Sequence, residues 1–423
     1  MNKLSLTVLL CGFSASLVCG QTTTTDWLQF RGPGRLNISP DKGLLKAWPE
    51  DGPKLVWKAT GVGEGFSSVA MKGDTVVTMG DADGSCQLFA VKRSDGSSLW
   101  STKVGRAGGG GGYPGPRCTP SIDGDYVYGI GQYGDLVCVQ LADGKEVWRK
   151  SFTNDFGGRH GAWQFAESPL VDGNLVLCTP GGPEATMVAL DKKSGEVKWK
   201  GVAPSDDAAG YSSIVPCTLG GVKQYMTLTS KGVVSFHATS GKLLWNYGAR
   251  GDRFADNTAN IPTPIPMKEQ VFAVAGYDRG GALLTIRNNR GMMNATEVYW
   301  SNKLKNKHGG VILVGNFIYG DSDDSGRIWC ADVKTGTIRW TRKDDIRASG
   351  SASMTYADGL LFVRWQNGYV GLVSANPAKY QLISSFKLPN GDGNCWAHPV
   401  VIGGKMYLRE KDTIWCYQVS AKK

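Results

Sequence analysis

The stretch ADVKTGTIRW, residues 331–340, decides the fold that this sequence predicts. It reads as a short apolar strand, a glycine-containing turn at residues 334–336 and a second strand that ends at Trp340. Clear copies of the phrase end at Trp100, Trp148, Trp199 and Trp245, and weaker ones at Trp300 and Phe386. A repeat of roughly 40 to 55 residues, rich in β-forming residues and glycine turns, indicates a propeller or a solenoid.

A second paired-strand pattern precedes each tryptophan phrase and distinguishes these two folds. Examples are SSVAMKGDTVVTM from Ser67, SPLVDGNLVLC from Ser168 and AHPVVIGGKMYL from Ala397. There are eight such patterns, and each is a hairpin followed by the tryptophan hairpin. Each unit therefore holds four short antiparallel strands. We therefore predict an all-β fold, an eight-bladed β-propeller built from four-stranded antiparallel blades.

The two ends of the chain are predicted to meet in one blade. The eighth unit has three strands of its own, of which the last is DTIWCYQVS at residues 412–420. The strand PKLVWKAT, at residues 53–60, precedes the first unit and would supply the missing fourth strand. This pairing would close the ring and remove an open sheet edge.

We expect three segments along the chain. Residues 1–20 have the features of a secretory signal peptide, because Lys3 precedes an apolar run and Gly20 stands at a suitable cleavage position. Residues 21–52 would form an N-terminal arm that packs on the propeller, and residues 53–420 the propeller itself. The mature chain would then be periplasmic or secreted and would have no transmembrane segment. A lipid anchor at Cys19 is the less favoured alternative, because the preceding Val18 is a poor match to a lipidation motif.

The composition predicts a turn-rich, well-packed protein that does not bind nucleic acid. The 423 residues include 58 glycines and 14 tryptophans, and only 20% of them are charged. Loss of Lys3 with the signal peptide changes the net charge from +10 to +9, and the one dense basic run is at residues 303–307. Eight of the ten cysteines lie beyond residue 20, mostly within strand patterns, where cysteine commonly acts as a small buried hydrophobe. The sequence contains no CxxC and no CxxCH motif, so neither a zinc site nor an attached haem is indicated.

The arm has the sequence WLQFRGPGRLNIS at residues 27–39. Its glycine and proline content argues against regular secondary structure. We expect Trp27, Phe30 and Trp48 to pin the arm to the outside or to one end of the propeller. The alternative is that Arg31 reaches a ligand.

Loop lengths separate the two faces of the predicted propeller. Turns inside the tryptophan phrases are tight, whereas the links between units are long, as at residues 105–116, 154–166 and 389–396. In a propeller these links emerge on one face around the central channel, and function concentrates on loops carried by a rigid scaffold. We therefore predict that binding occurs on this face. Its expected anchors are four aromatic residues and three arginines, Tyr113, Trp163, Tyr211, Trp396, Arg117, Arg159 and Arg253.

The phrase A-x-D-x-x-T/S-G-x-x-x-W, intact at residues 189–199 and nearly so at 330–340, resembles the pyrroloquinoline quinone (PQQ) repeat. That repeat builds the propellers of quinoprotein alcohol dehydrogenases and of the lipoprotein of the outer-membrane β-barrel assembly machinery. The N-terminal WLQFRGPGR and WPEDGPKLVWKATGVGEGFSS are similar to the start of PQQ-like propeller proteins common in Planctomycetes and related bacteria. The resemblance extends from about residue 27 to the end, and it is specific for the fold rather than for an activity.

The resemblance implies two classes of function. The first is a monomeric binding or scaffolding protein of the periplasm or cell envelope, whose channel-face loops hold an envelope protein, a peptide or a polysaccharide. The second is a PQQ- and calcium-dependent alcohol or aldehyde dehydrogenase, with Glu167 and Asn260 near the metal. Quinoprotein dehydrogenases contain adjacent cysteines and are much longer, and this sequence shares neither property. We therefore favour the binding protein and assign no catalytic or metal-ligating residue.

The candidates for a site in the channel are polar, charged or aromatic residues on the predicted inner-strand starts and long links. Glu167 and Asn260 could instead hydrogen-bond the ends of the inner strands. Three histidines near one channel could bind a metal or act as acid and base, but eight blades would scatter them around a wide ring. The complete set is Glu167, Asn260, Arg117, Arg159, His160, Trp163, His308 and His398.

Overall fold

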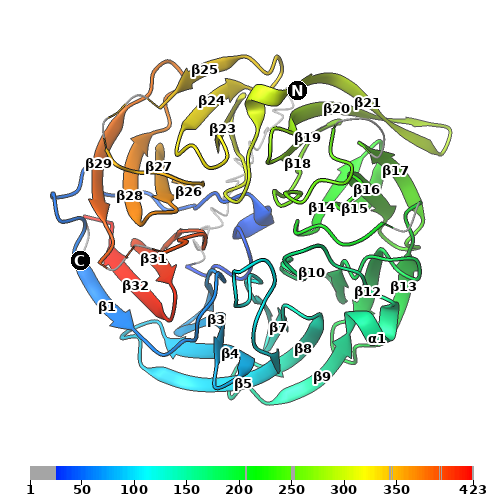
Figure 1. Ribbon diagram of the computed structural model, residues 1–423, viewed down its shortest axis with the longest axis horizontal. Helices are drawn as coiled ribbons and strands as arrows, with labels where there is room; N and C mark the ends of the chain where they lie inside the picture. Colours follow the sequence, from blue (N-terminus) through cyan, green and yellow to red (C-terminus); the bar gives the residue numbers. More distant parts are fainter. Residues whose placement is uncertain are drawn as a thin grey trace, which may run out of the picture.

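The computed structural model describes residues 25–204, 207–248, 253–342, 344, 346–389, 391 and 393–421. The predicted signal peptide and the alternative lipid-anchor position Cys19 lie outside these residues. In the described part, short apolar strands alternate with glycine turns and form eight separate four-stranded antiparallel sheets. Figure 1 shows these sheets arranged as blades of a ring, so the predicted eight-bladed β-propeller is confirmed.

The first four blades follow the order of the sequence. The first holds β2 (Ala70–Lys72), β3 (Thr75–Ala82), β4 (Ser85–Lys92) and β5 (Ser98–Arg106). The second holds β6 (Ser121–Asp123), β7 (Tyr126–Ile130), β8 (Asp135–Gln140) and β9 (Glu146–Ser151). The third holds β10 (Leu170–Asp172), β11 (Leu175–Cys178), β12 (Met187–Asp191) and β13 (Val197–Gly201). The fourth holds β14 (Val215–Leu219), β15 (Val222–Leu228), β16 (Val233–His237) and β17 (Leu243–Tyr247).

The next three blades repeat the pattern. The fifth holds β18 (Ile265–Met267), β19 (Gln270–Ala275), β20 (Gly280–Asn289) and β21 (Met292–Ser301). The sixth holds β22 (Ile312–Val314), β23 (Phe317–Asp321), β24 (Ile328–Asp332) and β25 (Ile338–Thr341). The seventh holds β26 (Ala352–Ala357), β27 (Leu360–Trp365), β28 (Tyr369–Ser374) and β29 (Leu382–Lys387).

The eighth blade joins the two ends of the chain as predicted. It holds β30 (Val400–Ile402), β31 (Lys405–Glu410) and β32 (Thr413–Gln418), and β1 (Leu55–Ala59) completes it. β1 pairs antiparallel with β32, so that Trp57 lies opposite Cys416. This pairing gives the eighth blade its fourth strand from the N-terminal part of the chain and so closes the ring.

The tryptophan phrase joins each blade to the next one. Trp199 of β13 donates a hydrogen bond from Nε1 to the carbonyl of Ala238, at 3.1 Å, in the fourth blade. Gly241, in the tight turn between β16 and β17, has φ +67°, and a Cβ there would lie 2.5 Å from the Trp199 ring. The pairs Trp57–Gly96, Trp100–Gly144 and Trp148–Gly195 repeat this contact. The repeat thus places an aromatic ring and the glycine that receives it at the same position in successive blades.

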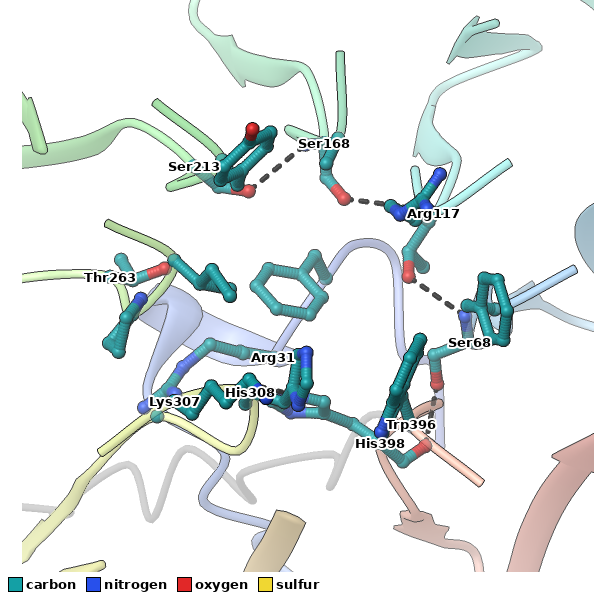
Figure 2. Close-up of a pocket in the computed structure, with 18 of the residues that line it drawn as sticks. Arg31, Ser68, Arg117, Ser168, Ser213, Thr263, Lys307, His308, Trp396 and His398 are labelled. Atoms are coloured by element: carbon teal, nitrogen blue, oxygen red, sulfur yellow. Dashed lines mark hydrogen bonds between the residues drawn. The ribbon is translucent and has the colours of Figure 1, made fainter. Parts of the chain in front are cut away.

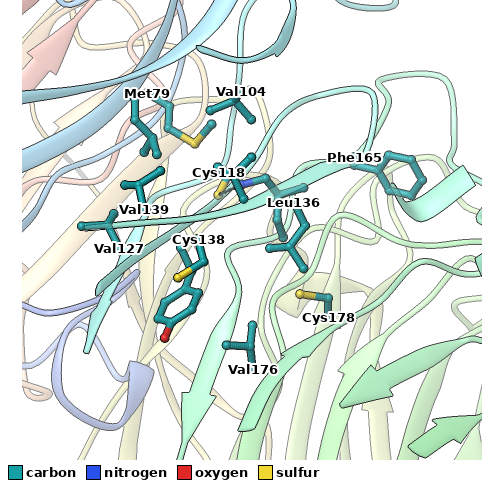
Figure 3. Packing of buried hydrophobic residues seen from close by; sticks show 14 of the residues in the cluster. Met79, Val104, Cys118, Val127, Leu136, Cys138, Val139, Phe165, Val176 and Cys178 are labelled. Carbon is teal, nitrogen blue, oxygen red and sulfur yellow. Dashed lines mark hydrogen bonds between the residues drawn. The ribbon is translucent and has the colours of Figure 1, made fainter. Parts of the chain in front are cut away.

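Buried apolar side chains fill the space between neighbouring blades. The cluster in Figure 3 joins the first three blades and includes Val104, Leu136 and Phe165 together with Cys118, Cys138 and Cys178. The eight cysteines after residue 20 are all free thiols, and seven of them are buried. They serve as small hydrophobic side chains, as their positions within strand patterns predict.

Helices are few and short in the residues that the structure describes. They are α1 (Phe152–Phe156) and the 3₁₀ turns η1 (Pro33–Arg35) and η2 (Asn302–Leu304). None of these described helices is long and apolar enough to cross a membrane.

The N-terminal arm runs across one end of the channel and projects into it. In Figure 1, η1 lies near the centre of the ring. Trp27 pairs with Met71 of β2, and the Ser39 amide donates to the carbonyl of Tyr356 in β26, at 2.8 Å. Asp41 accepts from the amide of Gly404 at 2.7 Å, in the turn between β30 and β31. The arm therefore lies at the end of the channel opposite the long interblade links.

Two of the three aromatic residues expected to pin the arm pack against the propeller. Trp27 is buried between the first and last blades, and Trp48 lies against Phe362 and Phe386 of the seventh blade. Phe30 instead points into the channel, where its ring lies 5.0 Å from that of His398.

Candidate functional site

A pocket of about 130 Å³ occupies the channel on the face of the long interblade links. Tyr113, Trp163 and Trp396 from these links form its walls, and Phe30 and Arg31 of the arm belong to its lining. Because the arm crosses the opposite end of the channel, this pocket is a recess and not an open tunnel. The remaining lining includes Phe66, Arg117, Tyr211, Tyr277, Lys307, His308 and His398.

A chain of hydroxyl groups forms one wall of the pocket (Figure 2). The backbone amide of Ser68 donates to the Thr119 hydroxyl at 3.1 Å, and the Thr119 amide donates to Ser168 at 2.9 Å. The Ser168 amide donates to Ser213 at 3.0 Å, and the Ser68 hydroxyl donates to the carbonyl of His398 at 2.7 Å. These bonds join residues just before the inner strands of five neighbouring blades, which are the eighth, first, second, third and fourth. They hold this side of the pocket in a fixed shape.

Aromatic rings line the pocket in two groups. The first group is Trp163 with Tyr211 and Tyr277, at centroid distances of 5.4 and 6.3 Å. The second group surrounds Trp396, and its members are Phe66 at 4.8 Å, Tyr113 at 5.0 Å and His308, stacked at 4.5 Å. Among the described residues no ring contact joins the two groups, and both groups line the cavity.

Two cationic side chains in the pocket wall already have partners. Lys307 forms an ion pair with Asp324 at 2.7 Å. Arg117 donates to the backbone carbonyls of Tyr113 and Gly115 at 2.8 and 3.1 Å. Burial lowers the pKa of Arg117 to about 10, so it remains charged at neutral pH.

Arg31 is a third cation, and it belongs to the arm. Its side chain is almost completely buried, with 3% of its surface exposed. Nε donates to the carbonyl of Arg35 at 3.0 Å and Nη2 to that of Val311 at 2.6 Å. Figure 2 shows Arg31 beside His308 within the pocket. Arg31 therefore packs against the propeller and also lines the pocket, and the alternative that it reaches a ligand stays a prediction.

His308 and His398 are neutral and hydrogen-bonded. The Asn37 amide group donates to Nδ1 of His398 at 2.9 Å, and Nε2 of His398 donates to the carbonyl of His308 at 3.2 Å. Burial lowers the pKa of both rings to about 3. A proton on Nδ1 of His398 would also face the donor group of Asn37. These rings act as polar walls at neutral pH and not as cations.

Glu167 and Asn260 do not line the pocket. Glu167 is buried and accepts a hydrogen bond from the amide of Thr179, while burial raises its pKa to about 7. Asn260 donates to the carbonyls of Thr229 and Phe254 at 2.7 and 2.8 Å. Both side chains thus bond backbone groups near strand ends, and they do not fit a calcium site in this pocket. Among the described residues no group of three His, Cys, Asp or Glu side chains is arranged to hold a metal ion.

Three further candidates lie away from the pocket. Arg159 and His160 are exposed, and His160 belongs to a groove beside β5 and β9 on the outer part of the ring. Arg253 forms an ion pair with Glu297 at 3.0 Å and lies over the Trp300 ring. The structure thus brings together Arg117, His308 and His398 with Trp163, and it does not bring His160 to them. The four aromatic residues expected as anchors all lie in the pocket.

Sequence reasoning missed Phe30, Phe66, Tyr277 and Lys307 as residues of the pocket. Phe66 stands four residues before β2, the same place that Trp396 has before β30, and Lys307 stands five residues before β22. A comparison of the residues before each inner strand could therefore have found them. Phe30 has no such signal, because the repeat does not include the arm.

The fold and the repeat define a PQQ-repeat β-propeller. The family model described as "Outer membrane protein assembly factor BamB" matches residues 87–342, and this chain belongs to that family. The predicted resemblance to PQQ-like propeller proteins is confirmed.

The chain is similar to curated and solved members of this fold at low identity. It is 21% identical to the outer membrane protein assembly factor BamB of Moranella endobia, over 66% of this chain and 69% of that protein. It is 22% identical to the BamB of Escherichia coli K12, over 75% of this chain and 87% of that protein. The quinohemoprotein alcohol dehydrogenase of Comamonas testosteroni has a TM-score of 0.68 at 12% identity, over 95% of this chain and 81% of that chain. At that identity the structural likeness shows the fold alone.

Proposed function

We propose that this chain is an exported, monomeric binding protein of the periplasm or cell envelope, and that the face of the long interblade links holds its ligand or partner. One observation carries the proposal. Two groups of aromatic rings and three cationic side chains converge on one recess, which the arm closes at its far end. Membership of a family described by an outer membrane assembly factor supports an envelope location.

The geometry of the recess suits binding. Its aromatic side chains lose few rotamers when a ligand is bound, and the hydroxyl chain and the ring contacts fix their positions before binding. Concave sites lined by rings, with a few placed polar groups, are typical of small-molecule sites. The favoured ligands are therefore groups that present a flat apolar surface and a negative charge.

The oxidoreductase alternative receives less support from these contacts. The two residues that the resemblance places near a calcium ion are Glu167 and Asn260, and both bond backbone groups outside the recess. No pair of adjacent cysteines occurs in the sequence. We therefore derive no catalytic step for this chain.

Photo-crosslinking in the native host tests which face of the propeller binds the partner. Tyr113→p-benzoylphenylalanine places the crosslinker on the link face, where Tyr113 is 36% exposed. Lys193→p-benzoylphenylalanine is the matched control, because Lys193 is exposed in the tight turn after β12, on the opposite face. We expect a discrete crosslinked product from position 113 and little from position 193. Equal yields, or products only from position 193, would show that the link face is not the binding face.

A further inference from the structure

We propose that the recess binds a single aromatic ring that carries a carboxylate, and that Arg31 of the N-terminal arm contacts this carboxylate. The inference rests on the proposed binding function and names the chemical class of its ligand.

The charge of Arg31 has no anionic partner among the described residues. Its two hydrogen-bonded acceptors, the carbonyls of Arg35 and Val311, carry no formal charge. By contrast, the negative charge of Glu167 acts on buried Arg35, and the charges of two glutamates act on buried Arg409. A buried cation without a counter-ion is costly, so an anion in the recess would be strongly favoured.

The guanidinium of Arg31 also has a donor available on the side of the recess. Nη1 makes no hydrogen bond with any described residue, whereas Nε and Nη2 each have one acceptor. Gly310 makes room for this nitrogen, because a Cβ at that position would lie 2.0 Å from it. An open guanidinium nitrogen can donate a charge-assisted hydrogen bond to an anionic oxygen such as that of a carboxylate.

The remaining lining agrees with a negatively charged ligand. No aspartate or glutamate is among the described residues that line the recess. Lys307 and Arg117 have partners of their own, but both add positive potential to its wall. The neutral His308 and His398 add no opposing charge. An anion therefore enters a recess with three cations in its lining and no carboxylate.

The volume of the recess suits one ring. Its volume is about 130 Å³. A cavity of about 150 Å³ in another protein holds one benzene molecule. The ring group of Trp163 and the ring group of Trp396 both line this space. A bound aromatic ring can therefore contact aromatic side chains of both groups, by its face or by its edge.

Calorimetric titration of the mature chain with three small probes tests the ligand class. Phenylacetate has the ring and the charge, phenylacetamide has the ring without the charge, and cyclohexylacetate has the charge without the aromatic ring. We expect phenylacetate to bind about 10- to 100-fold more tightly than phenylacetamide, the ratio of one charge-assisted hydrogen bond. Cyclohexylacetate should bind more weakly than phenylacetate. N-acetyl-phenylalanine then separates a free acid from the end of a longer chain, since tighter binding of this probe indicates a chain end.

Variants of Arg31 test the residue that recognises the charge. Arg31→Met should remove the preference for phenylacetate over phenylacetamide. It also leaves the carbonyls of Arg35 and Val311 without their donor, so the denaturation midpoint should fall whether or not Arg31 recognises the charge. Arg287→Met is the control, because Arg287 lies exposed on the β20–β21 hairpin, and it should keep the preference. A purely structural role of Arg31 would lower the midpoint but leave the preference intact. If Arg31→Met does not fold, the comparison of the three probes on the unaltered chain still decides the ligand class.

Two results would overturn the inference. The inference requires phenylacetamide to bind more weakly than phenylacetate, so equal affinities would contradict it. Absence of binding by every aromatic carboxylate would contradict it as well. If crosslinks still form from position 113 in that case, the proposal that the link face is the binding face is retained, and only the proposed ligand class is wrong. Loss of those crosslinks would show that the proposed function itself has failed.

Discussion

The contact between each tryptophan and the glycine of the next blade can be tested with Gly241→Ala. Gly241 has φ +67°, and an added Cβ would lie 2.5 Å from the ring of Trp199. The left-handed backbone should cost about 1–2 kcal/mol for a residue other than glycine. Displacement of the buried ring should add about 1–3 kcal/mol, the usual cost of overpacking a well-packed site. We therefore expect a loss of about 2–5 kcal/mol in the free energy of unfolding.

Gly173→Ala is the matched control for the backbone cost. Gly173 lies in the turn between β10 and β11 with φ +62°, and a Cβ there would meet nothing within 4 Å. It should lose only the backbone part, about 1–2 kcal/mol. Guanidinium denaturation followed by circular dichroism measures both variants against the unaltered chain, with the slope checked for constancy. Equal midpoints for the two variants would refute the claim that the tryptophan ring requires a glycine at position 241.

Three further predictions concern buried polar and thiol groups. The seven buried thiols should not react with Ellman's reagent in the folded chain, and all eight should react in denaturant. A reductant should not shift the denaturation midpoint, because the thiols are free. A lower midpoint in the presence of reductant would reveal disulfides. His398→Gln should reduce the rise in stability from pH 4 to pH 6 by about 1.4 kcal/mol per pH unit. The folded-state pKa of His398, about 3, is lower than the value of 6.5 in the unfolded chain. Below pH 6.5 the unfolded chain therefore binds a proton that the folded chain does not bind. The free energy of unfolding falls as the pH drops through this range. An unchanged slope in pH-dependent denaturation would contradict this assignment. Arg35→Met should cost about 3–5 kcal/mol, because it leaves the carbonyls of Ser168 and Pro169 without their donor and Glu167 without a nearby cation, and a denaturation midpoint equal to that of the unaltered chain would argue against it.

The blades could be predicted from the sequence because the repeat specifies both sides of each contact. Trp199 and Gly241 belong to the same phrase in successive units, so recognising the phrase also identifies the packing between blades. The closure of the ring followed from a count of strands, because β1 had no other partner. Local pattern and long-range contact agree in this part of the chain.

The path of the arm could not be predicted in the same way. Arg31, Arg35 and Asn37 all have positive φ, at 61°, 60° and 56°. These residues do not favour that conformation by themselves, and the surrounding channel holds them in it. No periodic pattern shows that Phe30 and Arg31 enter the channel. Side-chain direction was the part of the prediction that sequence reasoning could not supply.

The long links show the same limit within the candidate site. Their length indicated the face, and Tyr113, Trp163, Tyr211 and Trp396 all line the recess there. Arg159 lies only four residues before Trp163, yet it is exposed outside the recess. An irregular loop has no fixed period, so spacing does not tell which of its side chains face the channel.

The central claim is that the recess on the link face is the binding site. The most direct measurement is the anomalous scattering of iodine in crystals of the mature chain soaked with 4-iodophenylacetate. We expect an iodine peak in the recess, between the rings of Trp163 and Trp396, with the carboxylate within hydrogen-bond distance of Arg31 Nη1. A peak elsewhere on the propeller and none in the recess would contradict this expectation. A ligand in the recess whose carboxylate points away from Arg31 would contradict the role of Arg31.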